Sequence, residues 1–291
     1  MSAARGAVLT MQVVESLPAL REQVAGFRNE GARVAFVPTM GNLHAGHLAL
    51  VEHARSLAER VVVSIYVNPT QFGANEDFGN YPRTLERDCQ QLAKAGADVV
   101  YTPNDATMYP LGIENATHVS VAGIANRLEG KHRPGHFDGV ATVVARLFLM
   151  VAPDVAVFGR KDYQQVAVIE QMVQDLSLPV AVQSAPTVRE SDGLAMSSRN
   201  QYLSERDRAK APLLHRELSR IARALEGGVR DYKALRAEAV ATLEEAGFLC
   251  DYVAIRNPET LKKSKIEDTR WVVLAAALLG RARLIDNVSA G

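Results

Sequence analysis

The sequence is poor in cysteine and carries no excess charge of either sign. Cys89 and Cys250, the only two cysteines among 291 residues, lie far apart and show neither metal-ligand nor redox spacing. We therefore expect both to be reduced thiols in a cytoplasmic protein. Lys plus Arg and Asp plus Glu number 33 each, so no basic field is present to attract nucleic acid or an anionic membrane, and we expect neither as a partner.

Long apolar runs are also missing. Residues 1–10 have no long apolar core and no credible cleavage pattern, so no signal peptide is expected. The most apolar late stretch, residues 271–279, is far too short to span a bilayer, and we interpret it as a buried strand. Hydrophobic residues make up 47% of the chain, which is ordinary for a globular protein long enough to form about two domains.

Two common nucleotide-binding motifs are absent. Gly41 and Gly46 have the spacing of a P-loop, but His47 and Leu48 stand where that loop needs Lys followed by Ser or Thr. No Gly-x-Gly-x-x-Gly follows an early strand-like run, so the dinucleotide-binding fingerprint is missing too. Both motifs are therefore excluded.

The chain has instead a His-x-Gly-His motif directly after a strand-like run. Residues 33–38 predict a strand, residues 39–47 a turn containing glycine, and residues 48–54 a helix. Such a junction binds phosphate in parallel α/β sheets because free N–H groups and the helix dipole favour negative charge. His44 and His47 add donors that can follow charge developing on a phosphate. The pattern predicts a nucleotide site; the alternative is a turn histidine followed by a helix-surface histidine.

Strand-like and helical segments alternate up to about residue 182. This alternation predicts a parallel sheet covered by helices on both faces. The predicted fold class is α/β, a Rossmann-like doubly wound parallel sheet of the His-x-Gly-His nucleotidyltransferase type. The expected strands are Val34–Val37, Val61–Val67, Val99–Tyr101, Val155–Phe158 and Val180–Gln183, and the expected helices are Leu48–Arg60, Thr84–Ala95, Gly139–Val151 and Gln164–Leu176.

The pattern changes near Pro186, where helices are followed by clustered strands. It predicts a smaller α+β lid domain at residues 186–291 after a Rossmann-like domain at residues 1–185, with the ligand in the cleft between them. Residues 102–114 are rich in Pro, Asn and Gly and predict an exposed loop. The expected late elements are helices Glu205–Leu225 and Tyr232–Ala246 and strands Tyr252–Arg256, Trp271–Ala277 and Ala282–Asn287.

Polar residues follow two of the predicted parallel strands. Asn68 and Gln71 come after the strand at 61–67, where they could contact a small polar ligand or only cap a turn. Lys161 lies at a second strand-to-helix junction and would bring positive charge to a phosphate. Asp162 beside it could hold ribose hydroxyls or be a plain N-cap.

The segment between the two predicted domains, residues 188–200, is rich in hydrogen-bond donors. Ser197, Ser198 and Arg199 suit a polyphosphate, and a solvent-facing serine-rich linker is the alternative.

A further segment contains His132 and His136. Their i, i+4 spacing would suit a metal on a helix, but Pro134 and Gly135 lie between them and argue against such a helix. We interpret the segment as a basic loop near the cleft or as a subunit contact.

Six segments, in this order, resemble those of the pantoate–β-alanine ligase family. One such motif would be weak support, but six in the right order are highly specific, and the resemblance spans about residues 11–287. The segments are Pro38–His47, Asn68–Phe72, Tyr81–Thr84, Arg133–Phe137, Gly159–Asp162 and Asp192–Asn200.

The resemblance implies an enzyme, a ligase that forms an amide bond. It implies ATP-dependent condensation of pantoate with β-alanine through an enzyme-bound pantoyl adenylate, giving pantothenate, AMP and pyrophosphate. ATP, pantoate and β-alanine are thus the expected small-molecule partners. It also implies a homodimer and Mg²⁺. The sequence does not give the Mg²⁺ ligands, and Asp88 is a candidate only.

The resemblance also assigns residues. His47 matches the family's catalytic residue, and we add His44 and Lys161 as groups that share growing negative charge with Mg²⁺. Gln71 and Gln165 match the pantoate-binding glutamines; Gln71 also borders the β-alanine pocket, and we add Asn68 as a substrate contact. The implied ATP contacts are Met40, Gly41, Asn42, Leu43, His44, Ala45, Gly46, His47, Gly159, Arg160, Lys161, Asp162, Val188 at the adenine, and the mobile phosphate loop Met196, Ser197, Ser198 and Arg199.

Two departures from the family pattern are visible. Arg160 stands where the family usually has Glu, and its side chain is expected to face solvent. Residues 1–10 resemble an extension outside the family pattern. The rival interpretations are another nucleotidyltransferase of the same architecture and an ATP-binding sensor that has lost turnover.

Overall fold

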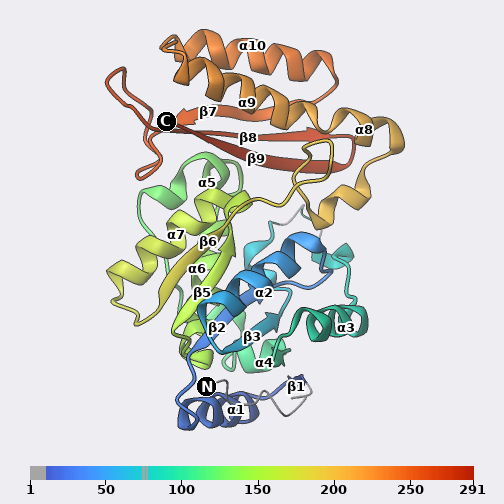
Figure 1. Cartoon of the computed structure of the whole chain (residues 1–291), viewed down its shortest axis with the longest axis vertical. Helices are drawn as coiled ribbons and strands as arrows, with labels where there is room; N and C mark the ends of the chain where they lie inside the picture. The colour runs from blue at the N-terminus through green and yellow to red at the C-terminus, as the bar shows by residue number, and fades with distance from the viewer. Residues whose placement is uncertain (1–10, 74–75, 77) are drawn as a thin grey trace, which may run out of the picture.

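The computed structural model describes residues 11–73, 76 and 78–291, and it contains two sheets (Figure 1). The N-terminal unit, residues 11–185, is built on six strands that all run parallel. The predicted fold class is confirmed. In spatial order the strands are β1 (Gln12–Val14), β4 (Val99–Tyr101), β3 (Arg60–Ile65), β2 (Val34–Thr39), β5 (Val155–Gly159) and β6 (Ala181–Ala185).

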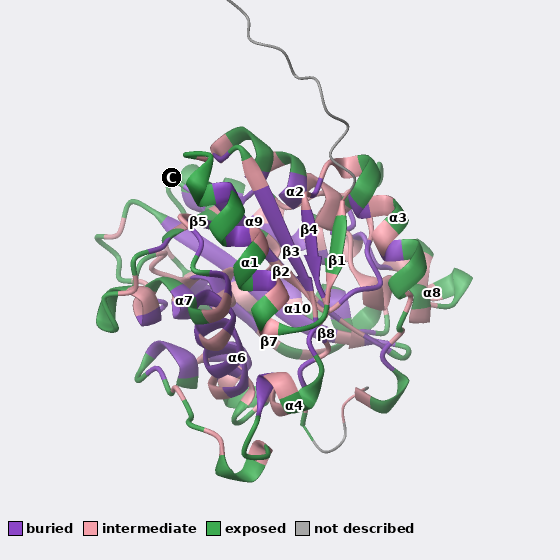
Figure 2. Ribbon diagram, turned by 90° about the horizontal axis from the view of Figure 1, so that it is seen from below, coloured by how far each residue is buried: buried purple, intermediate pink, exposed green. Residues whose placement is uncertain are grey.

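Helices cover both faces of this sheet, so the four central strands β2, β3, β4 and β5 are buried on both sides, whereas the edge strands β1 and β6 are partly exposed (Figure 2). Along β2, Val34 and Phe36 pack into one core, whereas Ala35 and Val37 pack into the other. This arrangement explains why the strands are continuous apolar runs without polar alternation. The first core takes α1 (Leu17–Asn29), α6 (His136–Val151) and α7 (Tyr163–Asp175), and the second takes α2 (Ala45–Leu57) and α3 (Leu85–Ala95).

Strand β2 lies in the middle of the parallel sheet, where the order of the strands reverses. Strand β3 pairs with one edge of β2 and β5 pairs with the other, which makes this point the topological switch of the sheet. Ligands of open α/β sheets bind in the crevice at the carboxyl ends of the strands at such a point. The fold therefore places the end of β2, and with it the His-x-Gly-His turn, where a nucleotide site is expected.

The C-terminal unit, residues 186–291, contains the antiparallel strands β7 (Leu249–Arg256), β8 (Trp271–Leu279) and β9 (Ala282–Ala290). Helices α9 (Leu213–Glu226) and α10 (Tyr232–Glu245) cover the outer face of this sheet (Figure 1). The other face joins the N-terminal unit, because Val272 and Leu274 belong to the core that contains α6 and α7. The central strand β8 is thus buried on both sides, which accounts for its unbroken apolar sequence.

Two expectations about local structure are wrong. The helix expected at Glu205–Leu225 is split into α8 (Glu205–Lys210) and α9, because Pro212 lacks the N–H that would continue a helix. The exposed loop expected at residues 102–114 contains the short helix α4 (Asp105–Met108), and both Met108 and Tyr109 are buried in the core. The remaining short elements are η1 (Pro69–Gln71), η2 (Phe78–Asn80), η3 (Ile113–Asn115), η4 (Ile124–Asn126), α5 (Leu128–His132), η5 (Arg160–Asp162) and η6 (Ser198–Tyr202).

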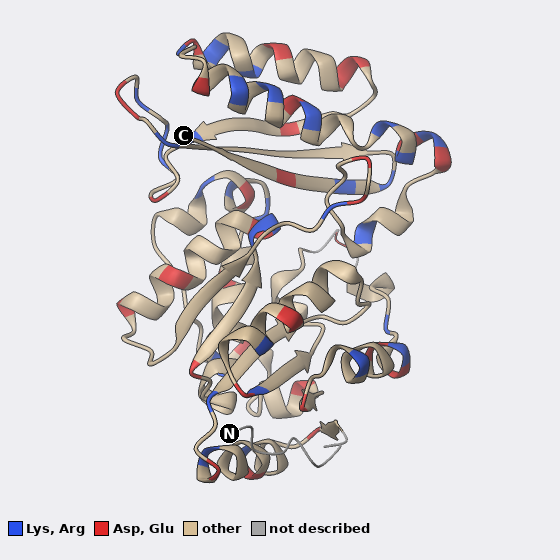
Figure 3. Cartoon of the chain, viewed as in Figure 1, with Lys and Arg blue, Asp and Glu red and all other residues tan. Residues whose placement is uncertain are grey.

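Basic and acidic residues are both present along helices such as α3, α9 and α10, with no helix of a single sign among these (Figure 3). Cys89 and Cys250 form no disulfide. Across the ranges that the structure describes, none of the helices has the length and apolar character needed to cross a membrane. The same ranges hold no group of three or more His, Cys, Asp or Glu side chains arranged for a metal ion.

Candidate active site

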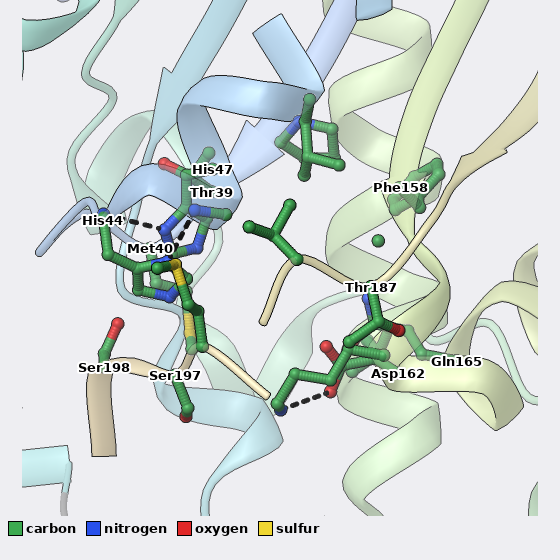
Figure 4. A pocket seen from close by; sticks show the side chains of 18 of the residues that line it. Thr39, Met40, His44, His47, Phe158, Asp162, Gln165, Thr187, Ser197 and Ser198 are labelled. Carbon is green, nitrogen blue, oxygen red and sulfur yellow. Dashed lines mark hydrogen bonds and ion pairs between the residues drawn. The ribbon is translucent and has the colours of Figure 1, made fainter. Parts of the chain in front are cut away.

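A cavity lies at the carboxyl ends of β2 and β5, between the two units. We call its side formed by residues 40–47 the histidine wall, and its side formed by residues 159–162 and 187–188 the lysine wall. The segment that follows residue 188 returns to the histidine wall, and Ser197 and Ser198 lie beside Met40 and His44 in Figure 4. In Figure 4, His44 and His47 lie on one side of the cavity and Asp162 and Gln165 on the other. The sequence-predicted residues that line it are Met40, His44, Gly46, His47, Gln71, Gly159, Lys161, Asp162, Gln165, Val188, Met196, Ser197, Ser198 and Arg199.

The two histidines are held by the start of α2. His44 is the N-cap, and its Nδ1 accepts the backbone N–H of Gly46 at 3.1 Å. The Nδ1 atom of His47 accepts the backbone N–H of His44 at 3.4 Å. A neutral imidazole has one donor nitrogen and one acceptor nitrogen, so both rings carry their proton on Nε2. The helix cap therefore leaves two N–H donors for a ligand.

Glycine at position 46 is required by the close approach of the His44 ring. A Cβ atom at this position would lie 2.8 Å from His44 Cε1, inside van der Waals contact. Gly41, two residues after β2, has a φ of 80°, a backbone angle that residues with a Cβ atom rarely adopt. The glycines of the turn thus let it bend sharply and let the first ring pack onto the helix start.

Both rings are neutral at physiological pH. Burial, followed by the positive charge of Lys161, lowers the pKa of His44 to about 4, while Asp162 opposes the shift. Burial also lowers the pKa of His47 to about 3, with smaller contributions in the same direction from His44 and Lys161. Neutral rings can donate a hydrogen bond to a phosphate oxygen without repelling the nearby ammonium group.

Asp88 supports the histidine wall from inside the N-terminal unit. Its fully buried carboxylate accepts the backbone N–H groups of Asn42 at 2.8 Å and Leu43 at 2.9 Å, and the hydroxyl of Thr84 at 3.1 Å. The carboxylate oxygens are used by these donors. Asp88 does not line the cavity, so these contacts support a role in positioning the turn and give no support to its candidate role as a Mg²⁺ ligand.

The lysine wall places its charges across the cavity from the histidines. Lys161 and Asp162 lie in the single turn η5 before α7, and Lys161 Nζ is 3.9 Å from Asp162 Oδ1. Asp162 stands at the N-cap position of α7, but its side chain makes no capping hydrogen bond. Among the residues lining the cavity, Asp162 is the one with a carboxylate.

Gln71 reaches the cavity from η1, directly after β3. Its Nε2 lies 3.1 Å from Met40 Sδ, and its Oε1 accepts a 3.2 Å hydrogen bond from Asn68 Nδ2. Asn68 itself is only 1% exposed and also donates to the Gly139 carbonyl, while Tyr109 donates to its Oδ1 at 2.6 Å. The prediction of Asn68 as a substrate contact is not borne out by these contacts, because its polar atoms already hold Gln71 and α6 in place.

His136 supports the same region from behind. Its Nδ1 donates to the Gln71 carbonyl at 2.8 Å, and Arg133 donates to its Nε2 at 3.0 Å. Burial, followed by the charge of Arg133, lowers the pKa of His136 to about 4, so this ring is also neutral. Arg133 in turn forms two 2.6 Å contacts with Glu76. The segment expected to be a basic loop is thus largely helical, and it supports Gln71.

One hydroxyl connects the predicted phosphate loop to the histidine wall. Ser198 Oγ donates to the Asn42 carbonyl at 3.1 Å, which connects the segment of residues 188–199 to the histidine turn. Within that segment, the N–H of Met196 donates to the Val188 carbonyl at 3.0 Å. These two hydrogen bonds fix the segment at the predicted phosphate loop, and residues 186–188 and 196–199 line the cavity.

Six predicted site residues do not line the cavity. Arg160 is exposed, and its guanidinium lies 3.4 Å from Ser184 Oγ on the outer side of β5 and β6, as expected for a solvent-facing residue. The others build the turn or support it from below: Gly41, Asn42, Leu43, Ala45 and Asn68.

Sequence reasoning missed an apolar floor. Side chains of α6 at i, i+3, i+4 and i+7 line the cavity, and this spacing predicts a helix without revealing which of its faces meets a ligand. The missed lining residues are Pro38, Thr39, Leu50, Tyr81, Val140, Val143, Val144, Leu147, Phe158, Pro186 and Thr187.

The fold and the site together define a class. A doubly wound parallel sheet, a cavity at its switch point, and neutral histidines facing a lysine are features of an α/β enzyme with a phosphate-binding site. The family described as pantoate-beta-alanine ligase matches residues 12–289, and the chain belongs to this family. It is accordingly a ligase that joins pantoate to β-alanine in pantothenate biosynthesis.

The similar proteins agree over nearly their whole length. A pantothenate synthetase of Stutzerimonas stutzeri is 54% identical over 278 residues, covering 96% of this chain and 97% of that protein. The crystal structure of pantothenate synthetase from Thermus thermophilus superposes with a TM-score of 0.89 at 47% identity, covering 96% and 99%. The crystal structure of a pantoate-beta-alanine ligase from Francisella tularensis, complexed with beta-gamma ATP and beta-alanine, superposes with a TM-score of 0.78 at 35% identity. The match covers 96% of this chain and 97% of that chain.

Proposed function

We propose that the reaction proceeds through a pantoyl adenylate formed in the cavity between the two walls. An oxygen of the pantoate carboxylate attacks the α-phosphorus of ATP, and the bond from that phosphorus to the β-phosphate oxygen breaks to release pyrophosphate. The amine of β-alanine then attacks the activated carbonyl carbon and loses a proton, and AMP leaves. The single observation that carries this proposal is that His44, His47 and Lys161 line one cavity, with both imidazole Nδ1 atoms occupied by backbone N–H groups so that Nε2 is the donor of each ring.

The chemistry requires positioning and charge stabilisation more than proton transfer. Negative charge grows on the α-phosphate as the carboxylate attacks, and fixed donors aimed at that charge lower the barrier. His44 and His47 supply neutral donors, and Lys161 supplies a full positive charge from the opposite wall. Ser197, Ser198 and Arg199 line the same cavity, and we assign them to the departing pyrophosphate.

Pantoate is assigned to Gln71 and Gln165, which line the cavity from different sides. Amide groups bind hydroxyls and carboxylates without adding charge, and the apolar side chains of α6 suit the methyl groups of pantoate. Because Asn68 and His136 fix Gln71 from behind, its amide is already oriented before substrate arrives. β-Alanine is proposed to enter beside Gln71, next to the activated carbonyl.

Mg²⁺ fits this site as a companion of ATP. The ion usually keeps several waters and binds through one or two carboxylates together with substrate phosphates. Asp162 is the carboxylate at the cavity that could hold it, and the ion would supply charge neutralisation on the phosphates. In this proposal the residues of the chain orient the phosphates, whether or not Mg²⁺ is bound.

We further propose that residues 186–291 form a domain of their own that covers the site, with Met196–Arg199 as the closing segment. A cover that excludes water protects an adenylate, which is prone to hydrolysis.

We also propose that the enzyme is a cytoplasmic homodimer. Sedimentation equilibrium would give the mass of two chains if the dimer assignment holds and of one chain if it does not.

The reaction proposal is tested by omitting one substrate at a time. With ATP and pantoate, we expect a burst of pyrophosphate equal to the amount of enzyme, followed by little turnover. Adding β-alanine should start sustained formation of AMP and pantothenate in equal amounts. Sustained AMP formation without pantoate would contradict the proposed reaction and favour another nucleotidyltransferase. If the enzyme turns over at its full rate with all three substrates but gives no pyrophosphate burst with ATP and pantoate alone, the adenylate route is contradicted.

A further inference from the structure

Strand β9 of the C-terminal unit reaches the turn that carries Lys161. Asn287 on this strand is 5% exposed, and its Nδ2 donates to the carbonyl oxygens of Arg160 at 2.9 Å and Lys161 at 2.8 Å. Only the nitrogen of an Asn amide can donate to a carbonyl, so both contacts fix the amide in one orientation. One side chain of the C-terminal unit thus holds two successive peptide groups of η5.

The residue before it holds Arg189, which directly follows the other segment of the lysine wall. Asp286 is buried, and its carboxylate accepts two hydrogen bonds from Arg189: Nη1 donates to Oδ2 at 2.7 Å and Nη2 donates to Oδ1 at 2.9 Å. Arg189 also donates to the Gly193 carbonyl at 3.1 Å, so it closes the turn that precedes the phosphate loop. A two-point contact between a guanidinium and a carboxylate fixes geometry as well as charge.

The two contacts belong to one structural unit. The backbone N–H of Asn287 donates to Asp286 Oδ1 at 2.7 Å, and Arg189 also donates to the Asn287 carbonyl at 3.4 Å. We call Asp286 and Asn287 the β9 clamp. Residues 159–162 and 188–199 lie far apart in the sequence, and the clamp is a point at which both are held by the same two residues.

We propose that Asn287 is a positioning residue: through the carbonyls of Arg160 and Lys161 it sets the place of the Lys161 ammonium group opposite the two histidines. The C-terminal unit then takes part in building the ATP site and does more than cover it. This inference rests on the proposed role of Lys161 at the phosphates. A long, flexible side chain is placed by its backbone, and a displacement of about 1 Å at a reacting centre can lower a rate about a hundredfold.

The test is a double-mutant cycle between Asn287→Leu and Lys161→Ala, read in the pyrophosphate burst with ATP and pantoate. Leucine has the same branching at Cγ as asparagine, is somewhat larger, and has no donor. We expect Asn287→Leu to lower the burst rate constant between about tenfold and a hundredfold, with a much smaller change in the KM for ATP. Because Asn287 acts through Lys161, its replacement should cost far less in the Lys161→Ala background, which is the non-additivity expected of coupled residues.

Controls separate this role from a loss of folding. Ser289→Ala changes an exposed side chain two residues along the same strand and should leave the burst unchanged. Asn287→Ser keeps one hydroxyl donor in a smaller side chain, so a partial recovery of the rate at equal folded concentration is expected, and this variant serves if Asn287→Leu does not fold. Additive losses in the cycle, or an Asn287→Leu burst equal to that of Ser289→Ala, would overturn the proposal. A Lys161→Ala enzyme with a normal burst would instead overturn the proposed role of the lysine.

Discussion

The histidine wall is braced from within the N-terminal unit, whereas the lysine wall is braced from the C-terminal unit. Asp88 on α3 holds the turn of residues 42–43, and the two histidine rings accept hydrogen bonds from their own helix start. The lysine wall at residues 159–162 and Arg189 beside it are instead held by Asp286 and Asn287 on β9. One wall is thus complete as soon as the parallel sheet has formed, and the other needs the second unit in place.

The difference bears on how the site can be both organised and covered. A pre-formed histidine wall offers fixed donors for the α-phosphate before ATP binds, which is the arrangement that lowers a barrier most effectively. A lysine wall tied to the C-terminal unit links the position of the charge to the position of the cover. The following variants test each side of this comparison separately.

Removing a ring from the histidine wall should have the largest effect. His47→Ala deletes one Nε2 donor and the acceptor for the His44 backbone N–H, and we expect the pyrophosphate burst to slow by about a hundredfold to a thousandfold. The fold should be intact, because the ring contributes little to either core. His53→Ala, a histidine change further along the same helix, is the matched control and should leave the rate unchanged. A near-normal burst in His47→Ala would remove the histidine from the mechanism.

Loosening the brace of the histidine wall should have the next largest effect. Asp88→Asn keeps the shape but presents an amide N–H₂ to one of the backbone N–H donors, so the turn should shift and the rate should fall by about tenfold or more. The free energy of unfolding should fall by roughly 1–3 kcal/mol, because a buried donor loses its acceptor. Chemical denaturation and burst kinetics measure the two quantities.

Asp98→Asn is the matched control for this brace. Asp98 also accepts a backbone N–H, that of Val61 at 2.8 Å, but it lies at the other end of the strands. We expect a similar loss of stability with no loss of rate per folded molecule. Equal losses of rate in the two variants would mean that Asp88 contributes only to stability.

Changing a proposed substrate contact should have a smaller and more selective effect. Gln71→Ala removes a neutral amide, and a lost hydrogen bond of about 0.5–1.5 kcal/mol corresponds to a rise of roughly two- to twelvefold in the KM for pantoate. The KM for ATP should change little. Gln174→Ala, an exposed position on α7, is the control. Equal weakening of both substrates would contradict the assignment of Gln71 to pantoate.

The smallest expected effect concerns the pH dependence of kcat/KM, in which we expect no histidine titration to appear. Because His44 and His47 have pKa values of about 4 and 3 in the folded protein, kcat/KM should have no inflection near the usual histidine value of 6.5. The stability contributed by neutral rings is fully present above pH 6.5 and is lost as the pH falls toward their folded-state pKa values, because the unfolded chain takes up protons first. Ring NMR titration of the free enzyme measures the pKa values, and a His44 or His47 midpoint near 6.5 would contradict this electrostatic account.

The sequence was sufficient to predict the histidine wall because its pattern is local. A strand, a glycine turn and a helix start lie within residues 34–57, and the position of this junction in a parallel sheet follows from general rules. The strand and helix alternation likewise predicted β2 to β6 and the long helices α2, α3, α6 and α7, but not the short helices α4 and α5. Helix α1 was missed although it carries a local signal, a Ser16 cap followed by Pro18 and apolar residues at Leu20, Val24 and Phe27.

The supports of both walls could not be predicted because they depend on contacts between distant segments. Asp88 lies 46 residues from Asn42 along the chain, and an acidic residue in the first turn of a helix is common for other reasons. Asn287 lies 126 residues from Lys161, in a strand whose pattern indicates only burial. Asn68 was assigned to substrate for the converse reason: the sequence does not reveal that the Gly139 carbonyl occupies its amide.

The most direct test of the account is a crystal structure with pantoate and an ATP analogue that cannot be cleaved between the α- and β-phosphates. We predict that the α-phosphate oxygens lie about 3 Å from the Nε2 atoms of His44 and His47 and from Nζ of Lys161. The terminal phosphates should lie against Met196–Arg199. A triphosphate bound elsewhere, or one that touches only a single wall, would contradict the claim that the two walls meet around one nucleotide.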